Sequence, residues 1–390
     1  MKKTAIICEI NPYHNGHRHI FRKARETFGG IVIAVMSGNF TQRAIPAVFD
    51  KYTRAGILVS TPEDGGEPAA DIVVELPFPW CSSGTESFAM GGVNIALAMG
   101  ADSLVCGSEN GDTEYIRGAA RAKGSSEYLR RLMEMEKESA RGEGSAVLSD
   151  RALSELGYSL GANDKLAAEY LRNIGEHEVD FRVFPRITGA AASYKSASDL
   201  RAMLYGGEYS PLAPYVPREA LSVYSYERER AVDLRNYRRL SHEFCRLSRL
   251  TGSLCSDYAE CGGGLWEWIS SKAEESITPD EFFRGAATKK YTDARIRRAI
   301  LFAMLGVRTE MLREPPRFTL LLAANGRGRE YLSELRKKST FPIITKPSNI
   351  PSEVSEQYSI HGRADRLYTM CRTPFEESGS YMKKHPVICP

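Results

Sequence analysis

Two histidines near the start of the chain have the type and spacing to act on a phosphoryl group. His14 and His17 stand three residues apart, with Gly16 between them, so on a helix they reach the same side. Imidazoles can donate hydrogen bonds to the charge that develops during phosphoryl transfer. Gly16 removes a side chain where backbone and ligand must approach closely. The pattern favours a nucleotide site over half of a metal site, because no third ligand with recognisable spacing stands nearby.

A strand and a helix are predicted on either side of these histidines. The β-branched, apolar run Thr4–Ile10 predicts a strand. A helical pattern opens at His17 and places apolar residues from Ile20 to Phe28 on one face. Such a junction presents backbone N–H groups and the positive end of a helix dipole to one point, where phosphate binds readily.

Further apolar runs predict that this strand belongs to a parallel sheet. Strands are expected at 31–36, 71–76, 102–107 and 180–184, with helices at 88–97, about 113–140 and 164–173. A Gly/Ser-rich stretch covers 142–145. Buried strands that alternate with helices indicate an α/β, Rossmann-like fold, in which ligands bind at the carboxyl ends of the strands.

The composition and the predicted secondary structure of the chain change after about residue 207. Three prolines between 211 and 217 mark a linker, and the rest is mainly helical and basic. We therefore expect a catalytic domain over 1–207 and a mainly helical domain over 208–390, with a loose polar tail from about 374. A short apolar run also occurs late, at 318–322.

Composition and charge agree with a protein that handles anions. The 390 residues hold no apolar stretch of membrane-spanning length, and the N-terminus leads straight into a strand, so a cytoplasmic location without membrane contact is expected. Eight scattered cysteines include no C-x-x-C pair, and support neither a disulfide framework nor a zinc site. Residues 1–60 carry nine Lys/Arg against three Asp/Glu, whereas 61–116 carry ten acids and no base. The basic opening suits a polyphosphate ligand, and a solvated charged surface is the alternative.

A second set of residues, Ser196 to Arg201, has two interpretations. Its small hydroxyl residues stand before Leu200 and are typical of a helix N-cap. The same helix start can bind an anion, with Ser198 and Arg201 on the β- and γ-phosphates of a nucleotide.

Together these motifs resemble the HxGH and SxTxxR motifs of the nucleotidyltransferase-like α/β-phosphodiesterase superfamily, and more narrowly the bacterial tRNA(Met) cytidine acetate ligases. The matching segments are Glu9–His17, Val35–Arg43, Asp71–Pro77, Asp102–Glu109, Gly161–Leu166, Pro185–Ile187 and Ser196–Arg201, with fainter matches at Lys289–Thr292, Asn325–Arg329 and Arg363–Tyr368. Ser198 keeps the hydroxyl of the motif threonine. The chain has Ala44–Ala47 where the family usually continues Gly-Glu-Pro-Ala, and Gly263–Trp268 where it usually carries a polar Asn-Arg pair.

The resemblance implies a HUP-type nucleotidyltransferase domain that activates acetate with ATP to acetyl-AMP. The acetyl group then passes to N4 of the wobble cytidine of elongator tRNA(Met). Magnesium is expected to arrive with ATP, and no resident metal is implied. The implied catalytic residues are His14 and His17. The implied ATP-binding residues are Ile7, Cys8, Glu9, Ile10, Asn11, Pro12, Tyr13, His14, Asn15, Gly16, His17, Arg18, His19, Ile20, Gly107, Asn163 and Arg186, together with Ser198 and Arg201.

The sequence is less specific about the residues that bind acetate, the acceptor cytidine and the rest of the tRNA. Residues that follow a strand end are candidates for an acetate or cytidine pocket, or else form a structural loop: Ser37, Gly38, Asn39, Gln42 and Arg43. A basic patch with one aromatic residue is the best candidate for tRNA binding, or else is an amphipathic helix: Lys289, Lys290, Tyr291, Arg295, Arg297 and Arg298. Lys51 and Arg54 are expected on a solvated helix face, with RNA contact as the alternative.

Two other functions stay open at this stage. One is an adenylyltransferase that acts on another small substrate. The other is a non-catalytic nucleotide- or RNA-binding homologue, which the altered segment Gly263–Trp268 favours and the intact His14, His17 and Arg201 oppose.

Overall fold

The computed structural model describes residues 1–62, 66–138, 144–186, 195–253 and 255–390. Residues 142 and 143 of the Gly/Ser-rich stretch and Ile187 of a family-like segment lie outside the described residues.

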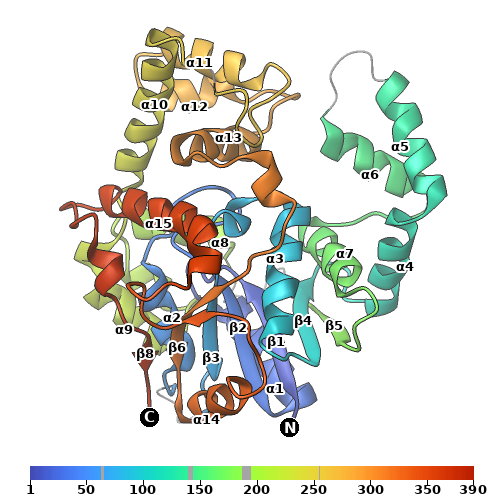
Figure 1. The fold of residues 1–390 in the computed structure, drawn as a ribbon, viewed down its shortest axis with the longest axis vertical. Helices are drawn as coiled ribbons and strands as arrows, with labels where there is room; N and C mark the ends of the chain where they lie inside the picture. Colours follow the sequence, from blue (N-terminus) through green and yellow to red (C-terminus); the bar gives the residue numbers. More distant parts are fainter. Residues whose placement is uncertain (63–65, 139–143, 187–194, 254) are drawn as a thin grey trace.

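A mostly parallel sheet forms the centre of the molecule (Figure 1). Its five parallel strands are arranged in the order β3-β2-β1-β4-β5. The direction of the chain along the sheet reverses at β1, which makes the gap between β1 and β4 the point where this fold binds ligands. The five strands are β1 (Lys3–Cys8), β2 (Ile31–Ser37), β3 (Ile72–Leu76), β4 (Ser103–Ser108) and β5 (Asp180–Pro185). All five predicted strands are confirmed.

The second half of the chain extends the same sheet. The late apolar run forms β6 (Thr319–Ala324), which pairs antiparallel with β3. β7 (Ile343–Ile344) and β8 (Val387–Ile388) pair with β6. The prediction of a loose tail is therefore wrong, since β8 is hydrogen-bonded into the sheet and Tyr381 is buried.

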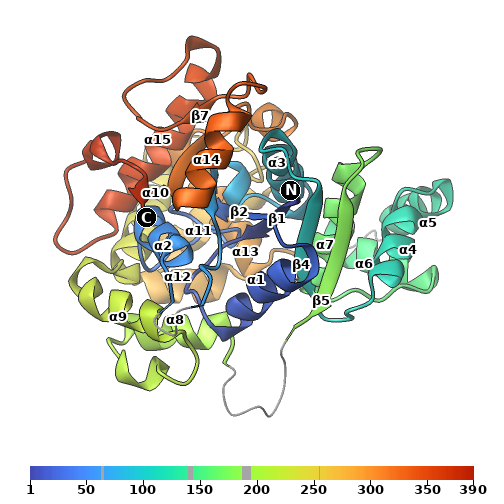
Figure 2. The ribbon, with the colours of Figure 1, turned by 90° about the horizontal axis from the view of Figure 1, so that it is seen from below.

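Helices cover the sheet, and α1 and α3 lie on opposite faces of it (Figure 2). The helices that surround the sheet are α1 (Asn15–Phe28), α2 (Lys51–Val59), α3 (Thr85–Ala98), α4 (Thr113–Lys123), α7 (Ala162–Ile174), α14 (Gly326–Leu335) and α15 (Ser355–Met370). The prediction of one helical region over about 113–140 is corrected, because the chain turns at Gly124 and starts a new helix, α5 (Ser126–Glu138). α5 and the unpredicted α6 (Ser145–Glu155) project from the body and share a small core around Tyr128 and Leu148.

A group of four helices from the second half lies over the carboxyl ends of the strands (Figure 1). It packs around Trp266 and Phe282 as a core of its own. Its helices are α10 (Leu234–Leu250), α11 (Leu265–Glu275), α12 (Pro279–Ala286) and α13 (Asp293–Leu305), and α8 (Ala197–Tyr205) and α9 (Arg218–Tyr226) connect it to the sheet. The predicted helical character of this half is confirmed. None of the described helices has the length and apolar character needed to cross a bilayer.

Candidate nucleotide site

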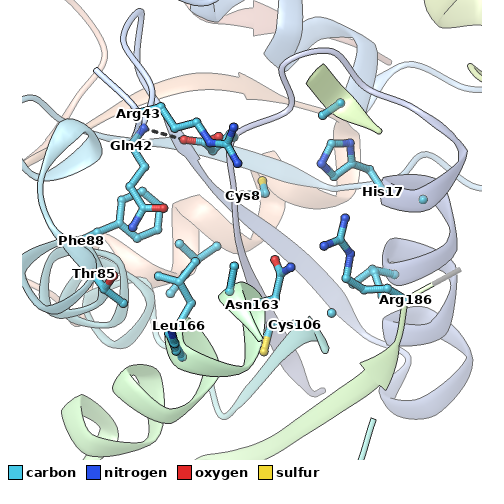
Figure 3. A pocket seen from close by; sticks show the side chains of 18 of the residues that line it. Cys8, His17, Gln42, Arg43, Thr85, Phe88, Cys106, Asn163, Leu166 and Arg186 are labelled. Atoms are coloured by element: carbon cyan, nitrogen blue, oxygen red, sulfur yellow. Dashed lines mark hydrogen bonds between the residues drawn. The ribbon is translucent and has the colours of Figure 1, made fainter. Parts of the chain in front are cut away.

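A cavity of about 760 Å³ opens at the carboxyl ends of β1 and β4, where the sheet topology places a ligand. The starts of α1, α7 and α8 contribute to its walls, and α13 contributes Ala294 and Arg298. Sequence-predicted residues that line it are Ile7, Cys8, Glu9, His14, Gly16, His17, Ile20, Gln42, Arg43, Gly107, Asn163, Arg186, Ser198, Arg201 and Arg298. Figure 3 shows His17 and Arg186 pointing toward one another at one end, with Gln42, Thr85 and Phe88 at the other.

The two histidines lie side by side at the start of α1. Their ring centroids are 3.9 Å apart. His14 is the N-cap of the helix, with a φ of −143°, and its Nδ1 accepts a hydrogen bond from the Gly16 N–H at 3.0 Å. A neutral imidazole whose Nδ1 accepts must carry its proton on Nε2. His14 is therefore assigned as an Nε2–H donor.

The surroundings keep both imidazoles neutral. Burial lowers the pKa of His14 to about 4, and the guanidinium groups of Arg186 and Arg201 act in the same direction. The pKa of His17 is also lowered, by burial first and then by His14 and Arg186, against an opposing contribution from the Pro12 carbonyl. Neutral histidines beside charged guanidinium groups can donate hydrogen bonds to an anion without adding further positive charge to the site.

The start of α1 contributes fewer free N–H groups than the sequence pattern indicated. The helix begins at Asn15 rather than His17, because His14 caps it. The Asn15 N–H donates to the Tyr215 carbonyl at 2.9 Å, and the Gly16 N–H donates to His14. Side chains, more than the helix terminus, must hold a phosphate here.

The structure confirms one interpretation of the segment Ser196–Arg201 and is compatible with the other. Ser196 and Asp199 form a capping box at the start of α8, which confirms the N-cap. Arg201 donates to the Asn11 carbonyl at 2.9 Å and to the Ser198 hydroxyl at 3.0 Å, so it ties α8 to the loop that carries the histidines. Ser198 and Arg201 both line the cavity.

Glu109, which no sequence pattern singled out as a site residue, organises the opposite wall. Its carboxylate accepts from the Asn163 side chain at 2.5 Å, from the Asp164 N–H at 3.1 Å and from Arg186 at 3.2 Å. It thereby holds the start of α7 and the Arg186 guanidinium against the end of β4. A Cβ on Gly107 would stand 3.2 Å from Arg186 Cγ, which explains the glycine at this contact.

Several ATP-binding candidates support the site without lining it. Asn11 accepts from the Val48 N–H, the Tyr13 N–H donates to the Tyr224 hydroxyl at 2.7 Å, and Asn15 donates to the Pro214 carbonyl. Ile10 adopts a left-handed φ of 53°. Ile10, Asn11, Pro12, Tyr13, Asn15, Arg18 and His19 are not among the residues that line the cavity.

The candidates for an acetate or cytidine pocket divide into two groups. Gln42 and Arg43 reach the cavity, and the Gln42 N–H donates to Glu9 at 2.6 Å. Ser37, Gly38 and Asn39 are buried outside its lining. Asn39 donates to Asp365 at 2.8 Å and accepts from the Lys51 N–H, which supports the structural-loop alternative for these three.

The expectation that Lys51 and Arg54 are solvated is wrong. Both side chains are fully buried. Arg54 donates to the carbonyls of Glu9, Ser37 and Gly38, and so holds together the loops that follow β1 and β2. A basic pattern on a short helix does not reveal such a role, because the partners are main-chain atoms.

The predicted tRNA patch is partly internal. Tyr291 is buried, its hydroxyl donates to the Gly263 carbonyl, and Lys290 and Arg295 lie over its ring. Arg295 and Arg298 pair with Glu260. Lys289 and Lys290 are exposed. Trp266 belongs to the core of the four-helix group, and the half-buried Trp268 packs against that core and donates to the Ala286 carbonyl.

The cavity also has an apolar side that the motifs did not reveal. Thr85, Phe88, Leu166 and Tyr170 line it. None of these four was predicted as a site residue, although Phe88 lies in the predicted helix 88–97 and Leu166 and Tyr170 lie in the predicted helix 164–173. All eight cysteines are free, and Cys8 and Cys106 at the cavity are buried.

Fold and site together define a nucleotidyltransferase of the HxGH type. The sequence profile of the HIGH Nucleotidyl Transferase family matches residues 1–382. The chain belongs to this family and, within it, to the tRNA(Met) cytidine acetate ligases.

Relatives and solved structures cover the chain from end to end. The tRNA(Met) cytidine acetate ligase of Syntrophotalea carbinolica is 30% identical over 94% of this chain and 90% of the relative. The tRNA(Met) cytidine acetate ligase of Limosilactobacillus reuteri is 29% identical, and the match covers 100% of this chain and 99% of the relative. The crystal structure of Thermotoga maritima TmcAL bound with alpha-thio ATP has a TM-score of 0.88 and 26% identity, with 100% of both chains covered.

Proposed function

We propose that the protein activates acetate with ATP and transfers the acetyl group to N4 of the wobble cytidine of elongator tRNA(Met). The observation that carries the proposal is the convergence of His14, His17, Arg186 and Arg201 on one cavity at the β1–β4 switch point. Relatives named tRNA(Met) cytidine acetate ligase support the acceptor, and the bound alpha-thio ATP of the Thermotoga maritima structure supports the nucleotide.

In the first step, an acetate oxygen attacks the α-phosphorus of ATP. The bond from that phosphorus to the bridging oxygen breaks, and pyrophosphate leaves. His14 Nε2–H and His17 donate to the α-phosphoryl oxygens as charge develops there. Arg186, Ser198 and Arg201 hold the leaving pyrophosphate. The step needs positioning and charge stabilisation, and no protein nucleophile.

The cysteines in the cavity wall agree with a reaction that has no covalent enzyme intermediate. Burial raises the pKa of the Cys8 and Cys106 thiols far above the neutral range. Both stay protonated and are poor nucleophiles.

Magnesium belongs to the substrate in this scheme. Among the described residues that line the cavity, Glu9 carries the only carboxylate, and it already accepts the Gln42 N–H. One occupied carboxylate does not fit a resident Mg²⁺ site, whereas the triphosphate supplies oxygen ligands itself. Mg²⁺ is therefore expected to enter with ATP.

In the second step, the cytidine N4 lone pair attacks the acetyl carbonyl carbon. A C–N bond forms, the bond between the acyl carbon and the AMP oxygen breaks, and N4 loses a proton as AMP leaves. The mixed anhydride is required because acetate itself has no useful leaving group. We assign the acetyl group to Gln42 and Arg43, because both line the cavity. We further assign most of the ATP site to 1–207, with Ala294 and Arg298 added from the second half, and most of the tRNA contact to 208–390.

Isotope exchange between ATP and pyrophosphate tests the first step. Exchange that depends on acetate, together with acetylation of tRNA(Met), is the expected result. Acetate-dependent exchange without tRNA acetylation would make the acceptor wrong. Exchange that depends on another small acid would favour the adenylyltransferase alternative, and no exchange with any acid would favour a non-catalytic homologue.

A further inference from the structure

A second cavity of about 320 Å³ lies next to the nucleotide cavity. It is enclosed by α8, by α10, α12 and α13 of the four-helix group, and by the loop after β2. Arg43, Ser198 and Arg201 line both cavities. A group bound in the second cavity therefore lies directly beside the residues assigned to the acetyl group and the phosphates. Its volume is at the small end of the range of about 300–1,000 Å³ for ligand sites.

The walls of this second cavity carry an excess of positive charge. Four arginines line it, Arg43, Arg201, Arg238 and Arg297, against a single carboxylate, Asp293. Arg297 pairs with Asp293 at 2.6 Å, and Arg238 pairs with Asp280. Among the described residues, neither Arg43 nor Arg201 has a carboxylate within ion-pair distance, and Glu9 of the nucleotide cavity is the carboxylate whose charge acts on both. Such a wall attracts an anion.

The same walls are aromatic. Tyr205, Tyr237 and Phe283 line the cavity, and the Arg238 guanidinium lies 5.8 Å from the centre of the Phe283 ring. The Tyr237 hydroxyl donates to the Ala44 carbonyl at 2.9 Å, and the Tyr205 hydroxyl donates to the Pro46 carbonyl at 3.4 Å. With both hydroxyl protons used, the tyrosines contribute mainly ring surface. Aromatic rings beside guanidinium groups are how proteins hold an unstacked nucleotide of single-stranded RNA.

We propose that the second cavity binds one unstacked nucleotide of the acceptor RNA, at or beside the base to be acetylated, with its phosphate on the arginines and its base against the aromatic residues. This inference rests on the proposed function, because that function supplies the need for an RNA base beside ATP. It also moves the acceptor site away from the buried Ser37, Gly38 and Asn39. The base reaches the acetyl group past Arg43, which both cavities share.

Arg238→Ala tests the charged wall, with Arg239→Ala as its matched control. Arg239 is the next residue of α10, is exposed and lines neither cavity. We expect Arg238→Ala to weaken tRNA binding about tenfold, while acetate-dependent ATP–pyrophosphate exchange stays within about twofold of wild type. Arg238→Lys should recover part of the binding. Arg239→Ala should change neither quantity.

Tyr205 tests the aromatic wall. Tyr205→Phe keeps the ring and should bind tRNA as wild type does, whereas Tyr205→Leu should bind at least about fivefold more weakly. Unchanged tRNA binding in both Arg238→Ala and Tyr205→Leu would overturn the proposal. A loss of exchange in Arg238→Ala equal to its loss of tRNA binding would also overturn it, since Arg238 would then serve the first cavity.

Two further measurements distinguish RNA binding from binding of a free nucleotide, and failure of this inference from failure of the proposed function. Cytidine monophosphate that binds more tightly than an anticodon stem-loop would assign the cavity to a free nucleotide and overturn the RNA assignment, and weaker binding supports it. If wild-type protein shows no acetate-dependent exchange, the proposed function fails. Direct tRNA binding by the same variants would then still decide the role of the cavity.

Discussion

Two polar clusters lie at the carboxyl ends of neighbouring strands. In one, charged groups face an open cavity, and in the other, charged groups are buried against each other. The cluster at β1 and β4 opens into the nucleotide cavity, where neutral histidines stand beside four arginines and Glu9 is the one carboxylate among the described lining residues. The cluster at β2 and β3 is closed. There the buried Lys51 ammonium lies 2.9 Å from Glu75, 2.7 Å from Asp365 and 3.3 Å from His361 Nε2.

The closed cluster has the ligand types and spacing of a metal site, but a lysine ammonium occupies the place of the cation. Ligand atoms of Glu75, His361 and Asp365 all lie within 4.8 Å of one another. Lys51 stands among them and supplies the positive charge. The cluster links α2 and α15 to β3, and so fixes the second half of the chain on the first. The comparison indicates that a buried cation held by carboxylates of the protein marks a structural site here, whereas arginines that face an open cavity mark a binding site.

Removal of Lys51 should produce the largest change in stability. Lys51→Met leaves two buried carboxylates without their counter-ion, which costs about 3–5 kcal/mol of unfolding free energy. Equilibrium denaturation in urea measures this quantity. Lys337→Met is the matched control, because Lys337 forms an exposed ion pair with Glu334 and its loss should cost less than about 1 kcal/mol. Equal losses in the two variants would remove the distinction between the clusters.

Removal of His17 should have the converse effect, a large loss of activity with little loss of stability. His17→Ala removes a donor to the α-phosphoryl group and should lower the rate of ATP–pyrophosphate exchange by about 10²–10³-fold. The unfolding free energy should change by less than about 1 kcal/mol, because the side chain lies in a cavity wall. The exposed His177, replaced by alanine, provides the control. Retained exchange in His17→Ala would contradict the catalytic assignment.

The two clusters also differ in how far the sequence predicts them. The histidine motif was visible because its residues are consecutive and its strand and helix are strongly patterned. The closed cluster joins residues 51, 75, 361 and 365, and no local pattern connects positions so far apart. For the same reason the sequence did not predict where the apolar run 318–322 belongs. It forms β6, which pairs antiparallel with β3, about 250 residues earlier in the chain. Charge alone misplaced Lys51 and Arg54, since buried and solvated cations look alike in a sequence.

The effect of acid on the closed cluster should be smaller and has a definite sign. Burial, and then Lys51, lower the pKa of His361 to about 3, below its unfolded value of about 6.5. The folded state therefore favours the neutral ring, and this contribution to stability is present above about pH 6.5 and is lost as the pH falls toward 3. The loss is about 1.4 kcal/mol per pH unit within that window.

His361→Gln isolates this contribution, since glutamine does not titrate. The unfolding free energies of wild type and variant should converge by about 2 kcal/mol between pH 6.5 and 5. Glu75 acts in the opposite direction in both proteins, because burial raises its pKa to about 7 although Lys51 opposes the shift. A constant difference across this window would show that His361 is not kept neutral by burial.

The smallest predicted effect concerns the loop that joins the two clusters and borders both cavities. Ala44 has a φ of 53°, in the left-handed region that disfavours residues with a Cβ by about 1–2 kcal/mol. Ala44→Gly should relieve that strain, offset by about 0.4–1 kcal/mol of added freedom in the unfolded chain. A rise of about 1–2 °C in the melting temperature is expected.

Ala47→Gly is the matched control for this prediction. Ala47 is buried in the same loop and its carbonyl accepts a tyrosine hydroxyl, as that of Ala44 does, but it is not among the residues with positive φ. Glycine at position 47 should therefore destabilise the protein by about 0.5–1 kcal/mol. Opposite signs in the two variants would show that the left-handed backbone of Ala44 costs folding free energy in the loop beside the nucleotide cavity. Equal losses would show that the left-handed geometry of Ala44 costs nothing.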